Sequence, residues 1–331
     1  MTTIRWGIAG LGAVADLIAR DLALVPGAEL VAVASRSMPK AERFAEQHGI
    51  PRPLGSYRAL LEDPTVDVIH VATPHSYHRD LALASIEHGK AVLVEKAFTA
   101  THVGAVEVID AARTHQVFVM EGMWTRFQPA VVALRELLTD GAIGRPLTIQ
   151  ADLMARRDYD PENRLMARDL AGGALLDLGS YVVSLAQHLL GDITFLDCQA
   201  RRYPNGLDSA ATINLRHVDG ALSTLSIGFD AHGPGRFAVY GTDGWLEILP
   251  RFHHPTTLLL HRPGTEPEAI ERLPLGLGYS HELIEVNERL TAGDIESPTM
   301  PLDDTLEVMR VLDECNRQVG INQAEEVVSL D

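Results

Sequence analysis

Apolar residues along the first third of the chain alternate between the spacing of a strand and the spacing of a helix. The run at 4–8 is apolar and β-prone, apolar positions over 14–22 follow the helical period, and 30–34 supplies a second strand. The segment 66–73 is apolar almost without interruption, as in a parallel strand buried on both faces. The same pattern predicts helices at 40–48, at 101–113 and up to residue 88, and strands at 91–94 and 117–121. We therefore expect an α/β fold with a doubly wound parallel sheet.

Beyond residue 127 the pattern changes to a helix at 129–140 followed by short alternating strands. Asp219-Gly220 and Asp243-Gly244 are two-residue hairpin signals between such strands. We expect strands at 147–154, 210–218, 221–229, 237–240, 245–249 and 257–261, a helix at 182–190, and helix again over 280–319. This predicts a C-terminal α+β domain with an open, mostly antiparallel sheet, one face of which is solvated or covered by a partner. We place the two domains at 1–122 and 123–331.

A glycine-rich turn joins the first strand to the first helix. Gly10, Gly12 and Ala15 fill the small-residue positions of a G-x-G-x-x-G/A pattern. The first allows a tight turn, the second lets the backbone approach a pyrophosphate, and the third lets helix and strand pack closely. The helix N-terminus offers unpaired N–H groups to the phosphates. We therefore predict an N-terminal Rossmann domain that contacts a dinucleotide through Gly10, Leu11, Gly12, Ala13 and Val14.

The end of the second strand indicates which dinucleotide is bound. An NAD-type site places an acidic residue there to bind the adenosine ribose. This chain instead has Ser35, Arg36 and Ser37, a guanidinium and two hydroxyls that suit a 2′-phosphate. The alternative is that Arg36 and Ser37 only open the next helix in solvent. We favour NADP, with NAD as the alternative.

Three residues are candidates for proton handling. Lys96 follows Glu95 at the carboxyl end of a predicted strand, where it could polarise a substrate hydroxyl or stand exposed in solvent. Asp177 and Tyr181 are four residues apart and share a face if both are helical. A tyrosine needs a nearby cation to act as a base near neutral pH, and Lys96 is the natural one. The alternative is that Tyr181 packs in the core and Asp177 caps the helix.

Composition narrows the classes of partner. The formal charge of −17 argues against nucleic acid and anionic membranes. We see no apolar run near the roughly 20 residues of a membrane span, and no secretory signal. Cys198 and Cys315 lack a metal-binding spacing, so we expect reduced thiols and a cytoplasmic protein. His75 and His78 lack a third ligand, so we expect no metal.

Several segments together resemble the glucose–fructose oxidoreductase / inositol dehydrogenase / MocA family over essentially the whole chain. They are the glycine loop at 7–15, Val71-Ala72-Thr73-Pro74-His75 with His78, Glu95-Lys96, and Gly172-Gly173-Ala174-Leu175-Leu176-Asp177-Leu178-Gly179-Ser180-Tyr181. Within the family, Glu121-Gly122-Met123-Trp124-Thr125-Arg126-Phe127 and the tail at 278–320 are similar to the dihydrodiol / D-xylose dehydrogenase branch. The family's Glu-Lys-Pro motif has Ala97 in place of proline here. The loop is therefore either trans or holds a rare cis bond.

The resemblance implies a set of site residues. Tyr181 is the catalytic tyrosine, with Lys96 and Asp177 beside it. Cofactor contacts beyond the glycine loop and 35–37 fall on Thr73, Pro74, His75, His78, Glu95, Lys96, Trp124 and Arg164, and substrate contacts on Trp124, Phe127, Asp177 and Tyr181. Trp124 and Phe127 could equally bury the domain junction, and Arg164 could be one of several solvated loop arginines with Arg156, Arg157 and Arg168. The resemblance also implies a homodimer or a dimer of dimers through the C-terminal sheet.

These features predict an oxidoreductase that moves hydride between a nicotinamide and a hydroxyl or carbonyl of a sugar or cyclic diol. Tyr181 and Lys96 handle the proton. Two alternatives stay open: a nucleotide-binding sensor without chemistry, since fold does not fix function, and a glycosidase- or lyase-type enzyme that retains its cofactor with no net redox.

Overall fold

In the computed structural model, which describes residues 3–331, three separate stretches of chain build the first of two compact units. Unit 1 combines Met1–Trp124 with Leu275–Thr305 and Ala324–Asp331. Unit 2 combines Thr125–Pro274 with Leu306–Gln323. The chain thus leaves unit 1 twice and returns to it twice. The single division after residue 122 stays a prediction.

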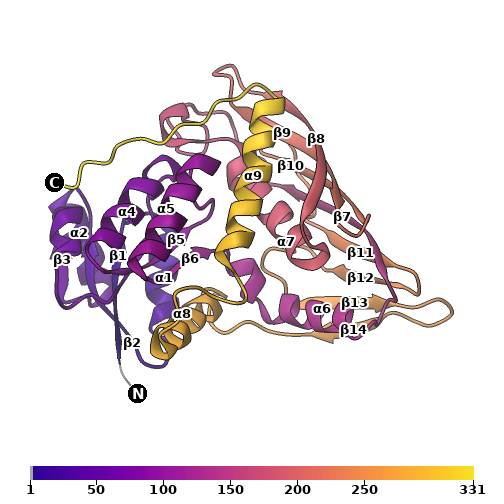
Figure 1. Cartoon of the computed structure of the whole chain (residues 1–331), viewed down its shortest axis with the longest axis horizontal. Helices are drawn as coiled ribbons and strands as arrows, with labels where there is room; N and C mark the ends of the chain where they lie inside the picture. The colour runs from indigo at the N-terminus through magenta and orange to yellow at the C-terminus, as the bar shows by residue number, and fades with distance from the viewer. Residues whose placement is uncertain (1–2) are drawn as a thin grey trace. The chain divides into compact units, whose positions relative to one another are not determined.

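Unit 1 contains a parallel sheet with the strand order β3-β2-β1-β4-β5-β6. Its strands are β1 (Ile4–Ala9), β2 (Ala28–Ala34), β3 (Arg52–Leu54), β4 (Val68–Val71), β5 (Ala91–Glu95) and β6 (Val119–Gly122). The helices are α1 (Ala13–Leu22), α2 (Met38–His48), α3 (Tyr57–Leu61), α4 (His78–Glu87), α5 (His102–His115) and α8 (Ser280–Ala292). Helices α4 and α5 lie together on one face of the sheet, as Figure 1 shows. The predicted doubly wound parallel sheet is confirmed.

The strand order reverses beside β1, because β2 lies on one side of it and β4 on the other. In doubly wound sheets, ligands bind outside the carboxyl ends of the strands at this switch point. The strands here are apolar on both faces, and Ile8, Val71 and Val94 have no exposed surface. Burial of this kind holds the strand ends, and the loops that follow them, in fixed positions.

Unit 2 contains the second sheet, with the order β14-β13-β12-β11-β7-β10-β9-β8. Its strands are β7 (Pro146–Met154), β8 (Ile193–Arg202), β9 (Asp208–His217), β10 (Leu222–Gly228), β11 (Phe237–Gly241), β12 (Trp245–Ile248), β13 (Thr257–His261) and β14 (Glu268–Glu271). Every neighbouring pair is antiparallel except β7 and β10, which are parallel. The prediction of a mostly antiparallel sheet is confirmed, although β8 and β14 were not predicted.

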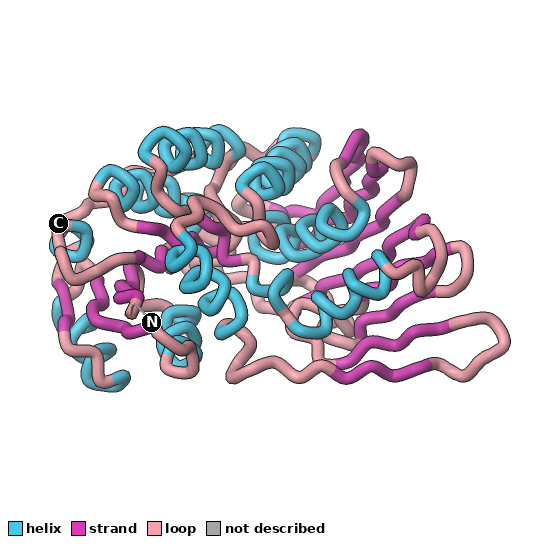
Figure 2. The backbone as a smooth tube through the Cα atoms, turned by 60° about the horizontal axis from the view of Figure 1, so that its bottom comes forward, coloured by secondary structure: helices cyan, strands magenta, loops and turns pink. Residues whose placement is uncertain are grey.

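One face of this sheet is covered by helices. Helices α6 (Pro129–Thr139) and α7 (Ser180–Leu190) pack against it, and Figure 2 shows helices along one side of the strands. Along β9, Ile213 and Leu215 are buried while Thr212, Asn214 and Arg216 are exposed. This alternation marks a core face and an open, polar face, as the sequence predicts. Helix α9 (Leu302–Gln318) begins in unit 1 and continues in unit 2.

One segment corrects an expectation about membranes. Arg168–Leu190 is long and apolar enough to cross a bilayer by length and composition, although we expected no run of that length. In the structure 83% of its most apolar window is buried inside the protein, as is usual for a core helix.

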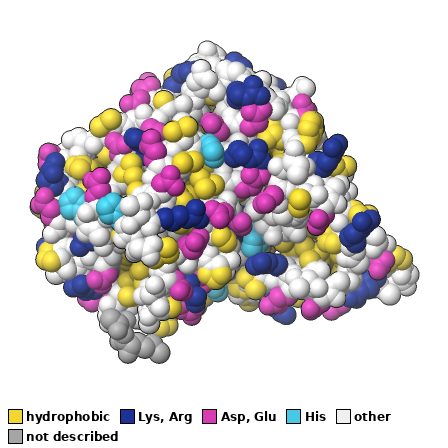
Figure 3. Space-filling model, viewed as in Figure 1, with side chains coloured by type: hydrophobic (Ala, Val, Ile, Leu, Met, Phe, Trp, Pro, Cys, Tyr) yellow, Lys and Arg dark blue, Asp and Glu magenta, His cyan; other side chains and the backbone are white. Residues whose placement is uncertain are grey.

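On the face that Figure 3 shows, acidic side chains stand among the basic ones, and the described residues form no continuous basic surface there.

Candidate functional site

The turn after β1 requires a glycine at its first position. Gly10 has φ +93°, a conformation that side chains disfavour. A Cβ atom there would also lie 2.8 Å from the carbonyl oxygen of Ala72, in the loop that follows β4. The Gly10 N–H donates to the carbonyl of Ala34 at the end of β2. Gly10 therefore joins three strand ends at the switch point.

The second glycine leaves open space. Gly12 is the N-cap of α1, it is exposed, and a Cβ built on it would meet no described atom within 4 Å. The first N–H groups of a helix have no partner inside the helix, and this helix has no side chain at the cap to satisfy them. Ala15, one turn later, is fully buried against the sheet. The open end of α1 fits the diphosphate of a dinucleotide.

The end of β2 presents a guanidinium held by two tyrosines. Arg36 is exposed, and its guanidinium carbon lies 5.6 Å from the centre of the Tyr77 ring. Burial raises the pKa of Tyr57, and the charge and hydrogen bond of Arg36 oppose that shift. Arg36 is thus fixed at the position where an NAD-type site has a carboxylate. Ser35 is buried, and its hydroxyl accepts from the N–H of Ser37, which is the N-cap of α2. The backbone of Ser37 therefore opens helix α2, as the alternative interpretation of this residue has it.

The two histidines after β4 differ in what their rings contact. His78 is fully buried, with Nδ1 2.9 Å from the carbonyl oxygen of Ala97 and Nε2 2.8 Å from that of Thr73. Burial lowers the pKa of His78, and the two carbonyls partly oppose this shift. His78 therefore connects the loop after β4 to the loop after β5. His75 is buried beside it, with the ring centres 5.7 Å apart. The predicted contact of either ring with a cofactor stays a prediction.

The loop after β5 carries Glu95 and Lys96. Glu95 is the last residue of β5, and its Oε1 lies 3.1 Å from Nε2 of the fully buried His70. The Lys96–Ala97 peptide bond is cis, which decides between the two alternatives that the missing proline left open. Lys96 stands at the carboxyl edge of the sheet, as its place in the sequence predicts.

Sequence reasoning missed Glu282 of α8, a fully buried carboxyl whose pKa is raised well above its usual range by burial, Glu95 and Asp21.

An aromatic pair stands just beyond β6. The rings of Trp124 and Tyr279 are stacked with centres 4.2 Å apart, and Trp124 is 6% exposed. Tyr279 precedes α8, and the isolated aromatic residue gave no signal in the sequence. Phe127, the second predicted aromatic contact, is buried in unit 2.

Unit 2 holds the predicted carboxylate and phenol. Asp177 lies in η4 (Leu175–Gly179), a single π-helical turn that leads into α7, and Tyr181 lies in the first turn of α7. A π turn closes i→i+5 hydrogen bonds, and the expectation that the two side chains share one helical face stays a prediction. π turns inside α-helices are frequent at functional sites. Asp177 is 8% exposed and Tyr181 is partly exposed.

His253 lies beside Tyr181. His254 is exposed, whereas His253 is partly buried and its ring centre lies 5.3 Å from that of Tyr181, with the rings tilted by 43°. The hydroxyl of Thr125 donates to the His253 carbonyl at 3.0 Å. Phe252, which precedes it, has no exposed surface and packs on Phe237. These contacts hold the imidazole beside the phenol.

A buried arginine that sequence reasoning did not select anchors α7. Arg126 is 1% exposed and donates to the hydroxyl and carbonyl of Ser184 and to the side chain of Gln187. These acceptors lie on the helix that carries Tyr181. The only signal was a charge within the apolar segment 123–127. Arg164, by contrast, is exposed on the loop after β7, and its predicted cofactor contact stays a prediction.

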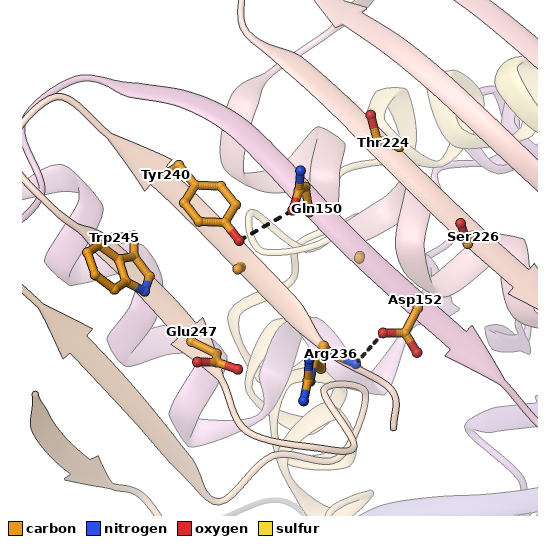
Figure 4. Close-up of a pocket in the computed structure, with 10 residues that line it drawn as sticks. Gln150, Asp152, Thr224, Ser226, Arg236, Tyr240, Trp245 and Glu247 are labelled. Carbon is orange, nitrogen blue, oxygen red and sulfur yellow. Dashed lines mark hydrogen bonds between the residues drawn. The ribbon is translucent and has the colours of Figure 1, made fainter. Parts of the chain in front are cut away.

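A cavity of about 490 Å³ lies on the open face of the second sheet. Figure 4 shows Tyr240 directed toward Gln150, to which its hydroxyl donates at 3.4 Å, and Asp152 accepting from the backbone N–H of Arg236. The ring of Trp245 stacks on His261 with centres 4.4 Å apart. The lining residues are Gln150, Ala151, Asp152, Thr224, Ser226, Arg236, Ala238, Tyr240, Trp245 and Glu247, and none of the predicted catalytic residues is among them. Over residues 3–331 no group of three His, Cys, Asp or Glu could hold a metal ion.

Comparison with known proteins covers both units. Residues 4–123 match the model of the oxidoreductase family with an NAD-binding Rossmann fold, and residues 131–247 match the GFO/IDH/MocA C-terminal domain. The trans-1,2-dihydrobenzene-1,2-diol dehydrogenase of Xenopus laevis is 33% identical over 326 residues, which span 96% of this chain and 98% of the relative. The Bos taurus enzyme of the same name is 32% identical over 328 residues, spanning 96% and 97%.

Solved structures show the same fold. An aldose–aldose oxidoreductase from Caulobacter crescentus, complexed with glycerol, has a TM-score of 0.87 at 26% identity, over 96% of this chain and 98% of that chain. A levoglucosan dehydrogenase, complexed with NADH and levoglucosan, has a TM-score of 0.89 at 19% identity, over 96% and 98%. The chain belongs to the GFO/IDH/MocA family and is an NAD(P)-binding oxidoreductase.

Proposed function

We propose that the protein is an NADP-preferring dehydrogenase that acts on a hydroxyl group of a cyclic diol or a sugar. The relatives are named dehydrogenases of a cyclic trans-diol, and structural neighbours are complexed with levoglucosan or glycerol. A nicotinamide supplies hydride transfer when it is bound. This chain supplies binding, orientation and proton transfer.

The preference for NADP rests on one observation, the exposed Arg36 at the end of β2. Its guanidinium is held over Tyr77 and beside Tyr57, and residues 35–37 include no carboxylate. A guanidinium binds phosphate oxygens in a charge-assisted pair, whereas the ribose of NAD needs an acceptor that is missing here. The neighbours leave the choice open, because a 3-ketoreductase from Actinomadura kijaniata is complexed with NADP and the levoglucosan dehydrogenase with NADH.

In this proposal Tyr181 removes the proton from the substrate hydroxyl while hydride leaves the carbon that carries this hydroxyl and passes to the nicotinamide. Lys96 polarises that oxygen and favours the phenolate form of Tyr181, since a nearby cation stabilises an anionic oxygen. Asp177 accepts hydrogen bonds from the substrate and so fixes which carbon reacts. Trp124 and Phe127 provide apolar surface for the ring of the substrate, and reduction uses the same groups in reverse.

Binding of NADPH and NADH, followed by nicotinamide fluorescence, tests the cofactor assignment. We expect NADPH to bind at least ten times more tightly than NADH, and Arg36→Ala to remove most of that difference. Arg43→Ala is the matched control, because Arg43 is an exposed arginine on the neighbouring helix α2. Equal affinities in the wild type would reject the NADP preference.

Turnover with NADP⁺ tests the reaction class. The first substrates are trans-1,2-dihydrobenzene-1,2-diol, levoglucosan and D-xylose, followed by a panel of aldoses, ketoses and cyclic diols. Absence of turnover across the panel would favour a nucleotide-binding sensor. NADP that co-purifies in stoichiometric amount would favour an enzyme that retains its cofactor without net redox.

We also propose a homodimer that uses the open face of the second sheet. The face is polar and carries the cavity lined by Trp245, Tyr240 and Glu247, with acidic and basic groups that can pair across a twofold axis. Light scattering after gel filtration tests this. A dimer that dissociates in Trp245→Glu, but not in Val103→Glu at an exposed position of α5, supports it, and a monomeric wild type rejects it.

A further inference from the structure

Asp208 is a buried carboxylate at the start of β9, with no exposed surface. Its Oδ2 accepts a hydrogen bond of 2.6 Å from the backbone N–H of Leu175. Leu175 is the first residue of η4, the π turn that carries Asp177 and runs directly into the helix of Tyr181. The side chain of one strand therefore contacts the beginning of the segment that holds both predicted proton-handling residues.

The two glycines before this segment give the carboxylate its space. Gly173 has φ +118°, and a Cβ at this position would overlap Oδ1 of Asp208. A Cβ on Gly172 would lie 2.7 Å from the carbonyl oxygen of Leu165. The Gly-Gly pair is thus required by the approach of Asp208 on one side and of the loop at 165–167 on the other.

Two further hydrogen bonds connect this segment to Asp177. The Asp177 N–H donates to the Gly173 carbonyl at 3.3 Å, and the Ser180 hydroxyl donates to the Asp177 carbonyl at 3.4 Å. A carboxylate at the beginning of a helical segment also interacts favourably with the partial positive charge of its N–H groups. Displacement of Leu175 would therefore move Asp177 and the first turn of α7 together.

The free-energy cost of burying the carboxylate of Asp208 is high for a side chain that accepts this one hydrogen bond. Burial raises the pKa of Asp208 to about 6, and the neighbouring N–H groups, first that of Leu175, together with the charge of Arg202 only partly oppose that shift. Oδ1 has no hydrogen-bond partner among the residues that the structure describes. A neutral amide could accept the Leu175 hydrogen bond with a smaller desolvation penalty. Stability alone therefore does not explain a carboxylate at this position.

We propose that Asp208 is a positioning residue that fixes the start of η4 and thereby orients Asp177 and Tyr181 toward the substrate. The inference rests on the proposed function, in which those two residues contact the substrate. Asp208 itself touches neither of the reacting groups.

The variants Asp208→Asn and Tyr181→Phe test the inference, with Asp230→Asn as a control. Asp230 is a carboxylate of the same unit that is held by Arg201 and Ser209. For Asp208→Asn we expect kcat with NADP⁺ and trans-1,2-dihydrobenzene-1,2-diol to fall at least tenfold and the Kd of NADPH to stay within twofold. We also expect faster hydrogen exchange over residues 174–181 and a Tm at pH 8 that does not fall. A merely structural residue would lower Tm along with kcat.

The outcomes separate the inference from the proposed function. Unchanged kcat and unchanged exchange in a folded Asp208→Asn, with Tyr181→Phe inactive, would overturn only the role of Asp208. Turnover retained by Tyr181→Phe would overturn the function of the tyrosine itself. If Asp208→Asn does not fold, Gly173→Ala decides, because its methyl group displaces Asp208 with the charge intact. A normal kcat in that variant rejects the inference, and a tenfold loss at normal NADPH affinity supports it.

Discussion

The indole of Trp124 and the phenol of Tyr279 lie parallel within 3°, with ring centres 4.2 Å apart. The backbone around Tyr279 is held by a third residue. Asp21, near the end of α1, accepts hydrogen bonds from the N–H groups of Leu277, Tyr279 and Ser280. Helix α1, which begins at the glycine loop, therefore also positions the aromatic pair of Trp124 and Tyr279.

Asp21→Ala should destabilise the protein by about 3 kcal/mol, because it leaves three N–H groups without an acceptor, one of them on the buried Ser280. Asp21→Asn should cost about half as much, since one oxygen remains to accept. Urea unfolding followed by tryptophan fluorescence measures both. Asp16→Ala on the same helix is the control, because Asp16 pairs with Arg20 and His48 near the surface. Equal stability of Asp21→Ala and the wild type would contradict this account.

The two glycines of the cofactor loop should respond differently to alanine. Gly10→Ala should lower Tm by several degrees, because it combines φ +93° with an overlap on the Ala72 carbonyl. Gly12→Ala should keep the wild-type Tm, since the new methyl group enters open space, yet weaken NADPH binding at least tenfold. Thermal unfolding and NADPH fluorescence distinguish the two effects. Tight NADPH binding by Gly12→Ala would mean that the phosphates lie elsewhere.

Removal of either proton-handling group should reduce turnover without unfolding the protein. We expect Tyr181→Phe and Lys96→Met to lower kcat by about 10² to 10⁴, the usual contribution of general acid–base catalysis. Tyr181→Phe should leave NADPH affinity unchanged, because Tyr181 belongs to unit 2. Stopped-flow measurement of NADPH formation checks both variants. Wild-type rates in both would favour a sensor.

Glu325 should make stability depend on pH. It accepts from the N–H and hydroxyl of Thr101 at the N-terminus of α5, and burial raises its pKa to about 7. A raised carboxyl pKa adds stability that is fully present below about pH 4.5 and is lost as pH rises through 7. Glu325→Gln should therefore stabilise the protein at pH 8 by up to about 3 kcal/mol, less after solvent screening, and leave pH 4.5 unchanged.

Urea unfolding at both pH values measures this effect. Glu326→Gln, at the exposed neighbouring residue, should change neither value. The same pH dependence in Glu325→Gln as in the wild type would assign it to another group.

The sequence predicted the elements whose burial is periodic. Strands buried on both faces in unit 1, and strands such as β9 with one buried face, each leave a clear pattern. Strand β14 was missed because its residues are mostly exposed, and β8 because two exposed residues, Thr194 and Phe195, interrupt its alternation at a bulge. The parallel pairing of β7 with β10 was not predictable, because the period of a strand does not record its partner.

The residues of the candidate site likewise divide into those that local sequence patterns predict and those that they do not. The glycine loop and Arg36 follow from local rules, because the chemistry and the turn lie within a few residues. Arg126, His253, Asp208 and Glu282 were missed because each acts on a segment far away in the sequence. The π turn at Asp177 was missed because i→i+5 bonding has no hydrophobic period of its own.

The order of segments in unit 1 has a consequence for synthesis. Residues 125–274 are made between its first stretch and its second, and residues 306–323 are made between its second stretch and Ala324–Asp331. Asp21 therefore waits for Leu277–Ser280, and Thr101 waits for Glu325, while the intervening chain is translated. Domains often fold as they emerge, N-terminal first. Here all six strands of the parallel sheet are made in the first stretch, whereas the segments that pair with Asp21 and Thr101 are made later, so the nucleotide-binding unit is completed only after most of unit 2 has been translated.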